Sequence, residues 1–364
     1  MREVKFLGKL PDPFAKEDGT RMTAAQWQEN KEVIRQKIVD IEFGGMPPRP
    51  EFVDFECLND GVPGRLTTWY RVKAGKKDRY VTFYLEIMQN KSMEKCPVLL
   101  TGDACYMNLE RDAIEEALKR GYAVARFNRL ELADDRKERK GPLFDLYPEH
   151  PDFTAISAWA WGYSVCMDVL EKLSYTDETE VGITGHSRGG KTVMLVASVD
   201  ERIKYVCPNN SGCHGAVSHR CVVTKQGDNE NERSERISDM IVNFPTWMGP
   251  KLWAYADREE QLPYDMHYFG ALIAPRYYLQ CEGMQDYWIN PIGAWQNFCA
   301  VKACYRYLGC EEHAGAWFRE GMHRQKFPDI VQFLDFMDRA RNGLPLAEHL
   351  CINPYPQIEK NFDW

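Results

Sequence analysis

The residue types best placed for chemistry lie at 185–189, where the chain reads Gly-His-Ser-Arg-Gly. A run with β-branched residues at 181–184 precedes this motif and an amphipathic stretch follows it, which predicts a strand, a sharp turn and a helix. A serine at such a turn is held clear of the backbone, and the first N–H groups of the helix point toward any oxyanion formed there. The pattern predicts that Ser187 is a catalytic nucleophile; the alternative interpretation is a structural turn.

A serine hydroxyl is a weak nucleophile unless a histidine takes its proton. In α/β-hydrolases the acid and then the histidine follow the serine along the chain, each after a later strand. His323 fits this order, because it lies between a predicted strand at 316–319 and the last predicted helix. His267 is the alternative base, although a structural hydrogen bond explains it better, and we interpret His313 as structural. His323 is therefore the predicted general base.

The acid of the predicted triad should lie just after a strand, and this strand should be the one before the strand that leads to the histidine. Asp286 follows a predicted strand at 276–282 after a glycine turn, which is the expected position. Glu282 is close enough in the chain to compete for this role. The acid would hold the imidazole tautomer and stabilise its cation, and Asp286 is the favoured candidate.

Strand and helix patterns alternate along the chain, which predicts an α/β-hydrolase fold with a mostly parallel, doubly wound sheet flanked by helices. The expected helices are at 24–43, 111–120, 153–173, 295–308 and 329–341, and the expected strands at 65–72, 80–87, 96–101, 122–127, 181–184, 203–208, 276–282 and 316–319. The simplest organisation is one domain over residues 1–364. It has an N-terminal helical extension at about 1–50 and an irregular insertion at about 209–265, after the post-elbow strand.

Composition limits the classes of partner. The chain has 364 residues, 44% of them hydrophobic, so it can bury a large core. Its net charge of −8 argues against nucleic acid or an anionic membrane as partner. No apolar run reaches the roughly 18 residues that a membrane span needs. The N-terminal segment lacks the apolar core of a signal peptide, which predicts a cytoplasmic location; a secreted chain whose signal had been removed would look the same.

The 12 cysteines include no C-x-x-C pair, and many fall inside apolar patterns, which is typical of buried free thiols. Cys213 and Cys221 flank His214 and His219, but this spacing fits no common zinc pattern. We therefore expect no metal and no cofactor, since a serine, histidine and acid supply both nucleophile and base.

Further motifs occur in order between about residues 95 and 340. They lie at 157–162, 185–191, 211–213, 262–267, 272–276, 286–291 and 319–323. Together they resemble the glucuronoyl esterase family (carbohydrate esterase family 15) and its acetylxylan-esterase-like relatives within the α/β-hydrolases. The resemblance implies that Arg188 helps to hold the oxyanion and that Lys191 binds sugar hydroxyls. It also implies that Trp247 and Glu235 contact the sugar.

Two positions depart from the family pattern. Many glucuronoyl esterases carry their acid as a glutamate just before Ser-Gly in the post-elbow strand, where this chain has Asn210. An amide cannot stabilise an imidazolium in the same way, so the acid is expected from the later strand, at Asp286. His186 stands where these esterases usually have cysteine, which is closer to the acetylxylan-esterase-like relatives.

These features predict a serine carboxylesterase that acts on a small carbohydrate ester through an acyl-enzyme. Arg188 and Lys191 lie on the acyl side of the nucleophile, which favours a glucuronate (4-O-methyl-glucuronoyl) ester. Deacetylation of xylo-oligosaccharides is the alternative, and a peptidase or dienelactone-type hydrolase is a further enzyme class. A catalytically silent α/β-hydrolase-fold protein that binds carbohydrate is the alternative of another kind.

Overall fold

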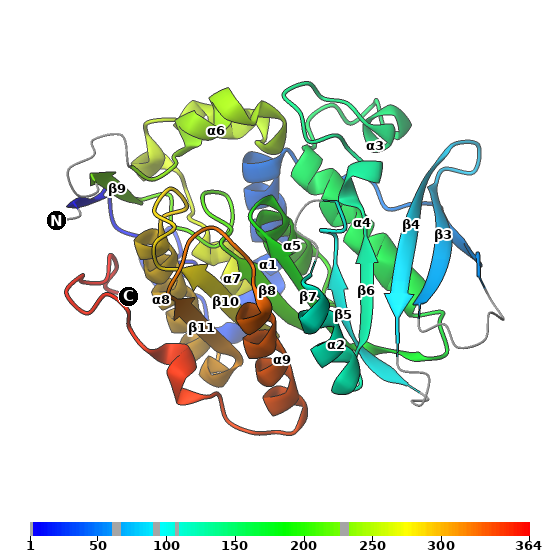
Figure 1. Cartoon of the computed structure of the whole chain (residues 1–364). Helices are drawn as coiled ribbons and strands as arrows, with labels where there is room; N and C mark the ends of the chain where they lie inside the picture. Colours follow the sequence, from blue (N-terminus) through cyan, green and yellow to red (C-terminus); the bar gives the residue numbers. More distant parts are fainter. Residues whose placement is uncertain (1–2, 60–66, 90–94, 106–108, 226–232) are drawn as a thin grey trace.

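The computed structural model describes residues 3–59, 67–89, 95–105, 109–225 and 233–364. Within them, one nine-stranded sheet has the order β11-β10-β8-β7-β5-β6-β4-β3-β2 and runs across the molecule (Figure 1). Its strands are β2 (Phe52–Cys57), β3 (Thr67–Gly75), β4 (Tyr80–Met88), β5 (Cys96–Thr101), β6 (Ala123–Phe127), β7 (Thr176–His186), β8 (Tyr205–Asn209), β10 (Tyr277–Gly283) and β11 (Ala314–Arg319). Six neighbouring strands of this sheet are parallel: β11, β10, β8, β7, β5 and β6. The other three, β4, β3 and β2, extend the sheet with antiparallel pairing.

Strand composition explains this division of the sheet. β5 is buried along its whole length, as parallel strands covered on both faces are. β4 alternates exposed and buried residues over its first half, as antiparallel strands with one wet face do. In β5, Val98 and Leu100 join one hydrophobic cluster and Leu99 joins the other, because successive side chains point to opposite faces.

Helices cover both faces of the sheet (Figure 1). α2 (Arg111–Lys119) and α9 (Phe327–Arg341) contribute to the smaller cluster on one face. The larger cluster on the other face includes residues of α1 (Ala24–Phe43), α4 (Ala155–Leu170), α5 (Arg188–Val199), α7 (His267–Ile273) and α8 (Pro291–Tyr307). The α/β-hydrolase architecture predicted from the alternating pattern is thus present, and no helix of the described residues is both long and apolar enough to cross a bilayer.

The insertion at 209–265 is less irregular than predicted. It contains β9 (Cys221–Lys225), α6 (Ile237–Asn243) and the short helices η2 (Pro245–Trp247), η3 (Pro250–Tyr255) and η4 (Glu259–Gln261). β9 pairs antiparallel with β1 (Glu3–Phe6), so the N-terminal segment lies beside the insertion. Local patterns missed this strand because its pairing partner lies more than 200 residues away in the chain.

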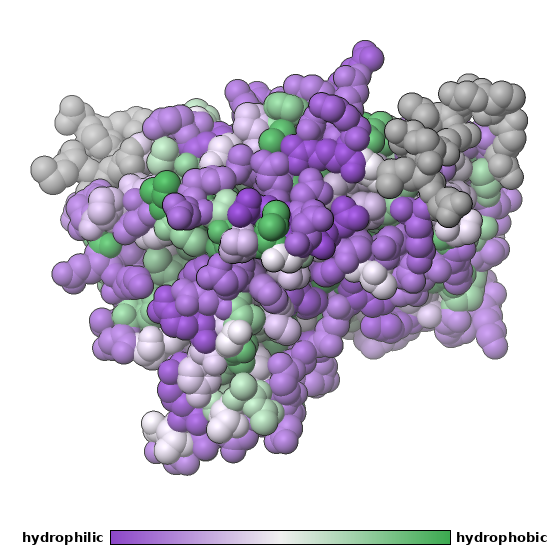
Figure 2. Space-filling view, turned by 90° about the horizontal axis from the view of Figure 1, so that it is seen from below, coloured by the Kyte–Doolittle hydropathy of each residue, from purple (hydrophilic) through white to green (hydrophobic). Residues whose placement is uncertain are grey.

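The remaining short elements are α3 (Pro142–Leu146), η1 (Arg129–Glu131), η5 (Glu311–His313) and η6 (Glu348–Cys351). The predicted helix at 24–43 coincides with α1, whose N-terminus is closed by a capping box between Thr23 and Gln26. Residues 65 and 66 of the predicted strand at 65–72 lie outside the described residues. On the face seen in Figure 2, hydrophilic residues dominate. The hydrophobic residues among those coloured by hydropathy form small, separate groups.

Candidate active site

Ser187 lies at a strained turn between β7 and α5. Its backbone has φ 57° and ψ −120°, a left-handed conformation that few non-glycine residues adopt. The neighbouring glycines are required by space: a Cβ at Gly185 would lie 2.4 Å from the carbonyl oxygen of Gly189, and a Cβ at Gly189 would lie 2.3 Å from Asp103. The predicted strand, sharp turn and helix around the serine are therefore present, with Arg188 as the first residue of α5.

His323 and Asp286 meet at the same edge of the sheet. His323, after β11, has its Nδ1 2.5 Å from Oδ2 of Asp286, which follows β10. The imidazole of His323 also packs against that of His186, with ring centroids 4.4 Å apart. Because His186 directly precedes Ser187, its contact with His323 places the His323 ring beside the nucleophile turn. Nδ1 is engaged by the acid, so Nε2 is the nitrogen available to the serine side.

Asn210 supports the acid rather than replacing it. Its Nδ2 donates to Oδ2 of Asp286 at 2.7 Å, and Asp286 itself is buried. Glu282, the competing acid, lies inside β10 and accepts a hydrogen bond from Gln280 at 3.1 Å. Burial raises the pKa of Glu282 well above its usual range. The carboxylate that contacts His323 is thus Asp286.

The other histidines considered as bases have structural partners. Nε2 of His267 lies 2.9 Å from the carbonyl oxygen of Pro11, and burial lowers the pKa of His267 to about 4. Nδ1 of His313 lies 2.5 Å from the carbonyl oxygen of Pro275. His186 is also kept neutral, because burial, with the nearby His323 adding to it, lowers its pKa to about 3.

A residue that the sequence did not single out holds Arg188. The guanidinium of Arg188 forms a hydrogen-bonded ion pair with Asp135, which follows η1. The other carboxylate oxygen of Asp135 accepts from Nε1 of Trp247 at 3.0 Å, and the guanidinium carbon lies 4.7 Å from the Trp247 ring centroid. In the sequence, Asp135 belongs to a charge-dense loop that is indistinguishable from a solvated one, so no signal marked it.

Trp247, which is predicted to contact sugar, is packed among protein groups in this structure. Its ring is 3% exposed and stacks on Phe244, with centroids 4.0 Å apart and planes 8° apart. Trp247 also packs against the guanidinium of Arg188, and its contact with sugar stays a prediction. Trp288 is 42% exposed, lies two residues after Asp286, and accepts at its backbone oxygen from the N–H of Glu235 at 2.9 Å. The sequence did not single out Trp288, although it lies within the family motif at 286–291, which was the signal that could have marked it as a site residue.

Lys191 and Glu235 form a buried pair beside the loop that follows β8. Nζ of Lys191 donates to the carbonyl oxygens of Ser211, at 2.7 Å, and Cys213, and lies 3.4 Å from Oε1 of Glu235. The same carboxylate oxygen accepts from the backbone N–H of Cys213 at 2.7 Å. Burial raises the pKa of Glu235, while the charge of Lys191 opposes that rise. The two predicted sugar-binding residues are therefore brought together, with protein groups as their partners.

Asp103, two residues after β5, binds the backbone just before the nucleophile turn. Its Oδ2 accepts from the backbone N–H of His186 at 2.7 Å, and its carboxylate pairs with the buried Arg129. Nothing in the sequence distinguishes this ion pair from a surface one, because burial depends on how β5 and η1 pack.

Comparison with known proteins places this geometry in a family. A family model described as glucuronyl esterase, fungi, matches residues 72–309, which is more than half of the chain. The chain belongs to the glucuronoyl esterase family. Proteins of this family are carboxylic ester hydrolases, and this chain is an enzyme of that class.

Similarity to individual glucuronoyl esterases extends over most of the chain. A carbohydrate esterase, MZ0003, from an unknown prokaryotic organism is 32% identical, with 92% of this chain and 90% of that protein covered. The 4-O-methyl-glucuronoyl methylesterase 1 of Wolfiporia cocos is 27% identical, with 91% and 80% covered. The solved glucuronoyl esterase of Caldicellulosiruptor kristjansonii superposes with a TM-score of 0.84 at 27% identity, with 97% and 96% covered. This likeness confirms the predicted α/β-hydrolase fold.

Proposed function

We propose that this protein is a serine esterase that hydrolyses 4-O-methyl-glucuronoyl or glucuronate esters of carbohydrates through an acyl-enzyme. The observation that carries the proposal is the hydrogen bond between Asp286 and His323, beside the strained turn at Ser187. A nucleophile next to a base, with the base oriented by an acid, defines the chemistry of a serine hydrolase. Relatives named 4-O-methyl-glucuronoyl methylesterases support the choice of ester.

In the first half-reaction, His323 Nε2 takes the proton of the Ser187 hydroxyl as its oxygen attacks the ester carbonyl. The oxyanion forms at the N-terminus of α5, where the backbone N–H of Arg188 and the guanidinium held by Asp135 stabilise it. His323 then gives its proton to the leaving alcohol, which departs and leaves a Ser187 ester. Water, deprotonated by His323, attacks that ester. The bond to Ser187 Oγ then breaks, His323 returns the proton to this oxygen, and the uronic acid leaves.

The sugar of the acyl group is assigned to the side of Lys191, Glu235 and Trp288. Trp288 is 42% exposed, and an aromatic side chain suits the apolar face of a sugar ring. Lys191 and Glu235 lie next to it through the Glu235–Trp288 backbone hydrogen bond and offer a cation and an acceptor for hydroxyl groups.

The second candidate, a deacetylase of xylo-oligosaccharides, is favoured by His186, whose ring packs on His323 where the family usually has cysteine. An ester panel distinguishes the two: benzyl glucuronate should be cleaved far faster than acetylated xylo-oligosaccharides. A higher kcat/KM for the acetylated sugars would overturn the uronate assignment and leave the esterase chemistry in place.

A serine-directed phosphonate separates an enzyme from a silent binding protein. We expect it to label the wild-type protein stoichiometrically at Ser187 and to leave Ser187→Ala unlabelled. Ser187→Ala should also lose hydrolysis of aryl esters, down to the residual rate from binding and the oxyanion site. Hydrolysis by Ser187→Ala at the wild-type rate would remove the proposed nucleophile.

A further inference from the structure

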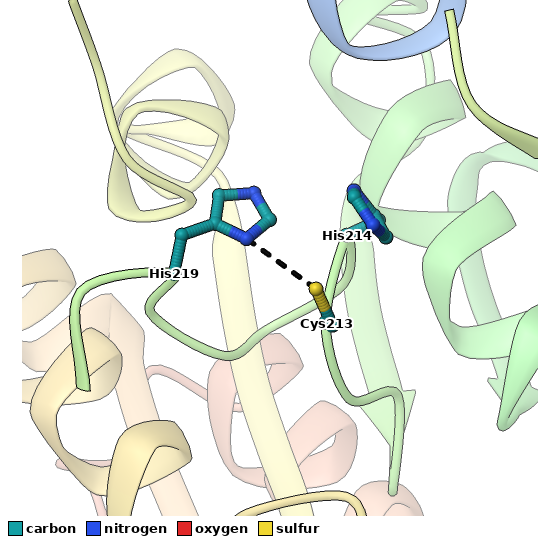
Figure 3. A group of neighbouring side chains, drawn as sticks. All are labelled: Cys213, His214 and His219. Atoms are coloured by element: carbon teal, nitrogen blue, oxygen red, sulfur yellow. Dashed lines mark hydrogen bonds between the residues drawn. The ribbon is translucent and has the colours of Figure 1, made fainter. Parts of the chain in front are cut away.

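Behind the Lys191–Glu235 pair lies a buried cluster that the proposed mechanism does not use. Cys213, His214 and His219 come from the loop between β8 and β9, and one ligand atom of each lies within 4.8 Å of the others (Figure 3). Sγ of Cys213 is 3.4 Å from Nδ1 of His219. All three side chains are buried. The sulfur and one nitrogen of each imidazole therefore lie close together, away from solvent.

A carboxylate from α1 holds both imidazoles. Oε1 of Glu42 lies 2.5 Å from Nδ1 of His214 and 3.1 Å from Nε2 of His219. The hydroxyl of Tyr264 donates to the other oxygen of Glu42 at 2.5 Å. A carboxylate that accepts one N–H from each ring fixes both tautomers and leaves the second nitrogen of each ring as a lone-pair donor.

A metal ion needs a nitrogen lone pair, and in each ring the nitrogen that does not contact Glu42 can supply one. In His219 the second nitrogen is Nδ1, which already faces the Cys213 sulfur. In His214 it is Nε2, which is buried and has no hydrogen-bond partner among the described residues. A buried polar atom without a partner is unfavourable, and a metal ion would satisfy it.

We propose that Cys213, His214 and His219 bind a divalent transition-metal ion of the Zn²⁺ class, with Glu42 as the carboxylate that orients both histidine ligands. One thiolate and two imidazoles are the donor types that Zn²⁺ takes in proteins, and they disfavour Mg²⁺ and Ca²⁺. The proposal departs from the expectation of no metal, which rested on chain spacing. Spacing could not reveal that Glu42, some 170 residues earlier, completes the arrangement.

The place of the cluster indicates a structural metal. Ser211 and Cys213, on the same loop, supply the carbonyl oxygens that hold Lys191, and the N–H of Cys213 holds Glu235. The three ligands are distinct from Ser187, His323 and Asp286. A metal here would fix the loop that carries the predicted sugar-binding pair and would leave the acyl-transfer chemistry to the serine.

Elemental analysis of the full-length protein, purified under reducing conditions without chelator, measures the metal content. Replacement with Co²⁺ then reports a thiolate ligand through its charge-transfer absorption band. We expect about one equivalent of metal and the Co²⁺ band in the wild-type protein. Both should be lost in Cys213→Ser and retained in Cys221→Ser, which alters a buried cysteine outside the cluster.

A folded wild-type protein that carries no metal and takes up no Co²⁺ overturns the proposal, and the cluster is then a hydrogen-bonded network only. A Co²⁺ band that persists in Cys213→Ser overturns it as well. If Cys213→Ser does not fold, His214→Gln serves as the second variant, with loss of the bound metal expected. Hydrolysis of benzyl glucuronate is measured separately, because a metal-loaded but inactive protein would count against the proposed function alone.

Discussion

The carboxylate of Asp135 holds the guanidinium of Arg188, the residue that directly follows the predicted nucleophile. The same carboxylate accepts from the indole of Trp247, over which the guanidinium lies. Two hydrogen bonds and a cation–π contact therefore fix the direction of a flexible side chain. Asp135 thus acts as a positioning residue for the arginine that the family resemblance assigns to the oxyanion.

Asp135→Asn should lower kcat about tenfold or more, with a small effect on KM, for both benzyl glucuronate and p-nitrophenyl acetate. The reason is that a misplaced guanidinium stabilises the oxyanion less, whereas substrate binding does not depend on it. Asp134→Asn is the matched control, since Asp134 pairs with Arg136 instead. A rise in KM without a fall in kcat would show that Asp135 serves binding, and wild-type kinetics would remove its role.

Asp286→Asn should lower kcat/KM roughly 10³- to 10⁴-fold, because an amide leaves the His323 imidazole in the wrong tautomer and its cation without a counter-charge. Glu282→Gln is the matched control, because it alters the other buried carboxyl that was considered as the acid; this variant should retain activity. Loss of activity in Glu282→Gln together with an active Asp286→Asn would reverse the assignment.

Glu282 also gives a test in protein stability. Its pKa is raised in the folded protein, chiefly by burial and further by the charge of Asp286. A carboxyl of this kind contributes stability below its unfolded pKa of about 4.5, and that contribution is lost as the pH rises through the folded pKa. Glutamine does not titrate, so Glu282→Gln should gain stability relative to wild type as the pH rises. Urea unfolding at a series of pH values measures this, and a pH-independent difference would contradict it.

Local sequence predicted most strands of the sheet and candidate residues that the fold brings together, Asp286 and His323, for a physical reason. Buried parallel strands such as β5 are continuous apolar runs that need no partner to be recognised. Active-site loops follow strand ends in chain order, so His323 and Asp286 could be placed by topology alone. The nucleophile turn was visible because its glycines are demanded by local sterics.

The features that sequence missed depend on contacts between distant segments. Asp135 meets Arg188 across 53 residues, and Glu42 meets His214 across 172. Trp247 and Trp288 are both tryptophans near a predicted site, and only packing decides that the first is buried and the second exposed. Burial of a particular side chain is a property of the assembled fold, so no spacing rule separates the two.

The two tryptophans should differ in their kinetic effects. Trp288→Ala should raise KM for benzyl glucuronate about 2- to 10-fold, since an aromatic contact adds about 0.5–1.5 kcal/mol, and should scarcely change hydrolysis of p-nitrophenyl acetate. Trp247→Phe keeps the ring but removes the N–H that Asp135 accepts, so it should lower kcat on both substrates. A selective KM effect from Trp247→Phe would support Trp247 as the sugar contact, and an unchanged KM in Trp288→Ala would exclude Trp288.

Lys191 lies four residues after Ser187, so on α5 it rises along the face next to the nucleophile. An acetyl group offers no hydroxyls to an ammonium, whereas a glucuronoyl group does. The contact of Lys191 Nζ with Glu235 is long, at 3.4 Å, so a sugar hydroxyl can replace it as the acceptor. Lys191→Ala should therefore raise KM for glucuronate esters by the loss of one charge-assisted hydrogen bond, at about 1.5–3 kcal/mol. Hydrolysis of p-nitrophenyl acetate should hardly change.

The structure sharpens this test, because Lys191 also neutralises the buried Glu235. Lys191→Ala alone leaves that carboxylate buried without its cation, which destabilises the fold independently of any substrate. The double variant Lys191→Met with Glu235→Gln removes both charges, so its thermal stability should recover toward wild type. Its KM for benzyl glucuronate should stay raised, since neither replacement provides a cation for the sugar hydroxyls. If KM recovers together with stability, Lys191 supports the loop and the uronate preference must have another source.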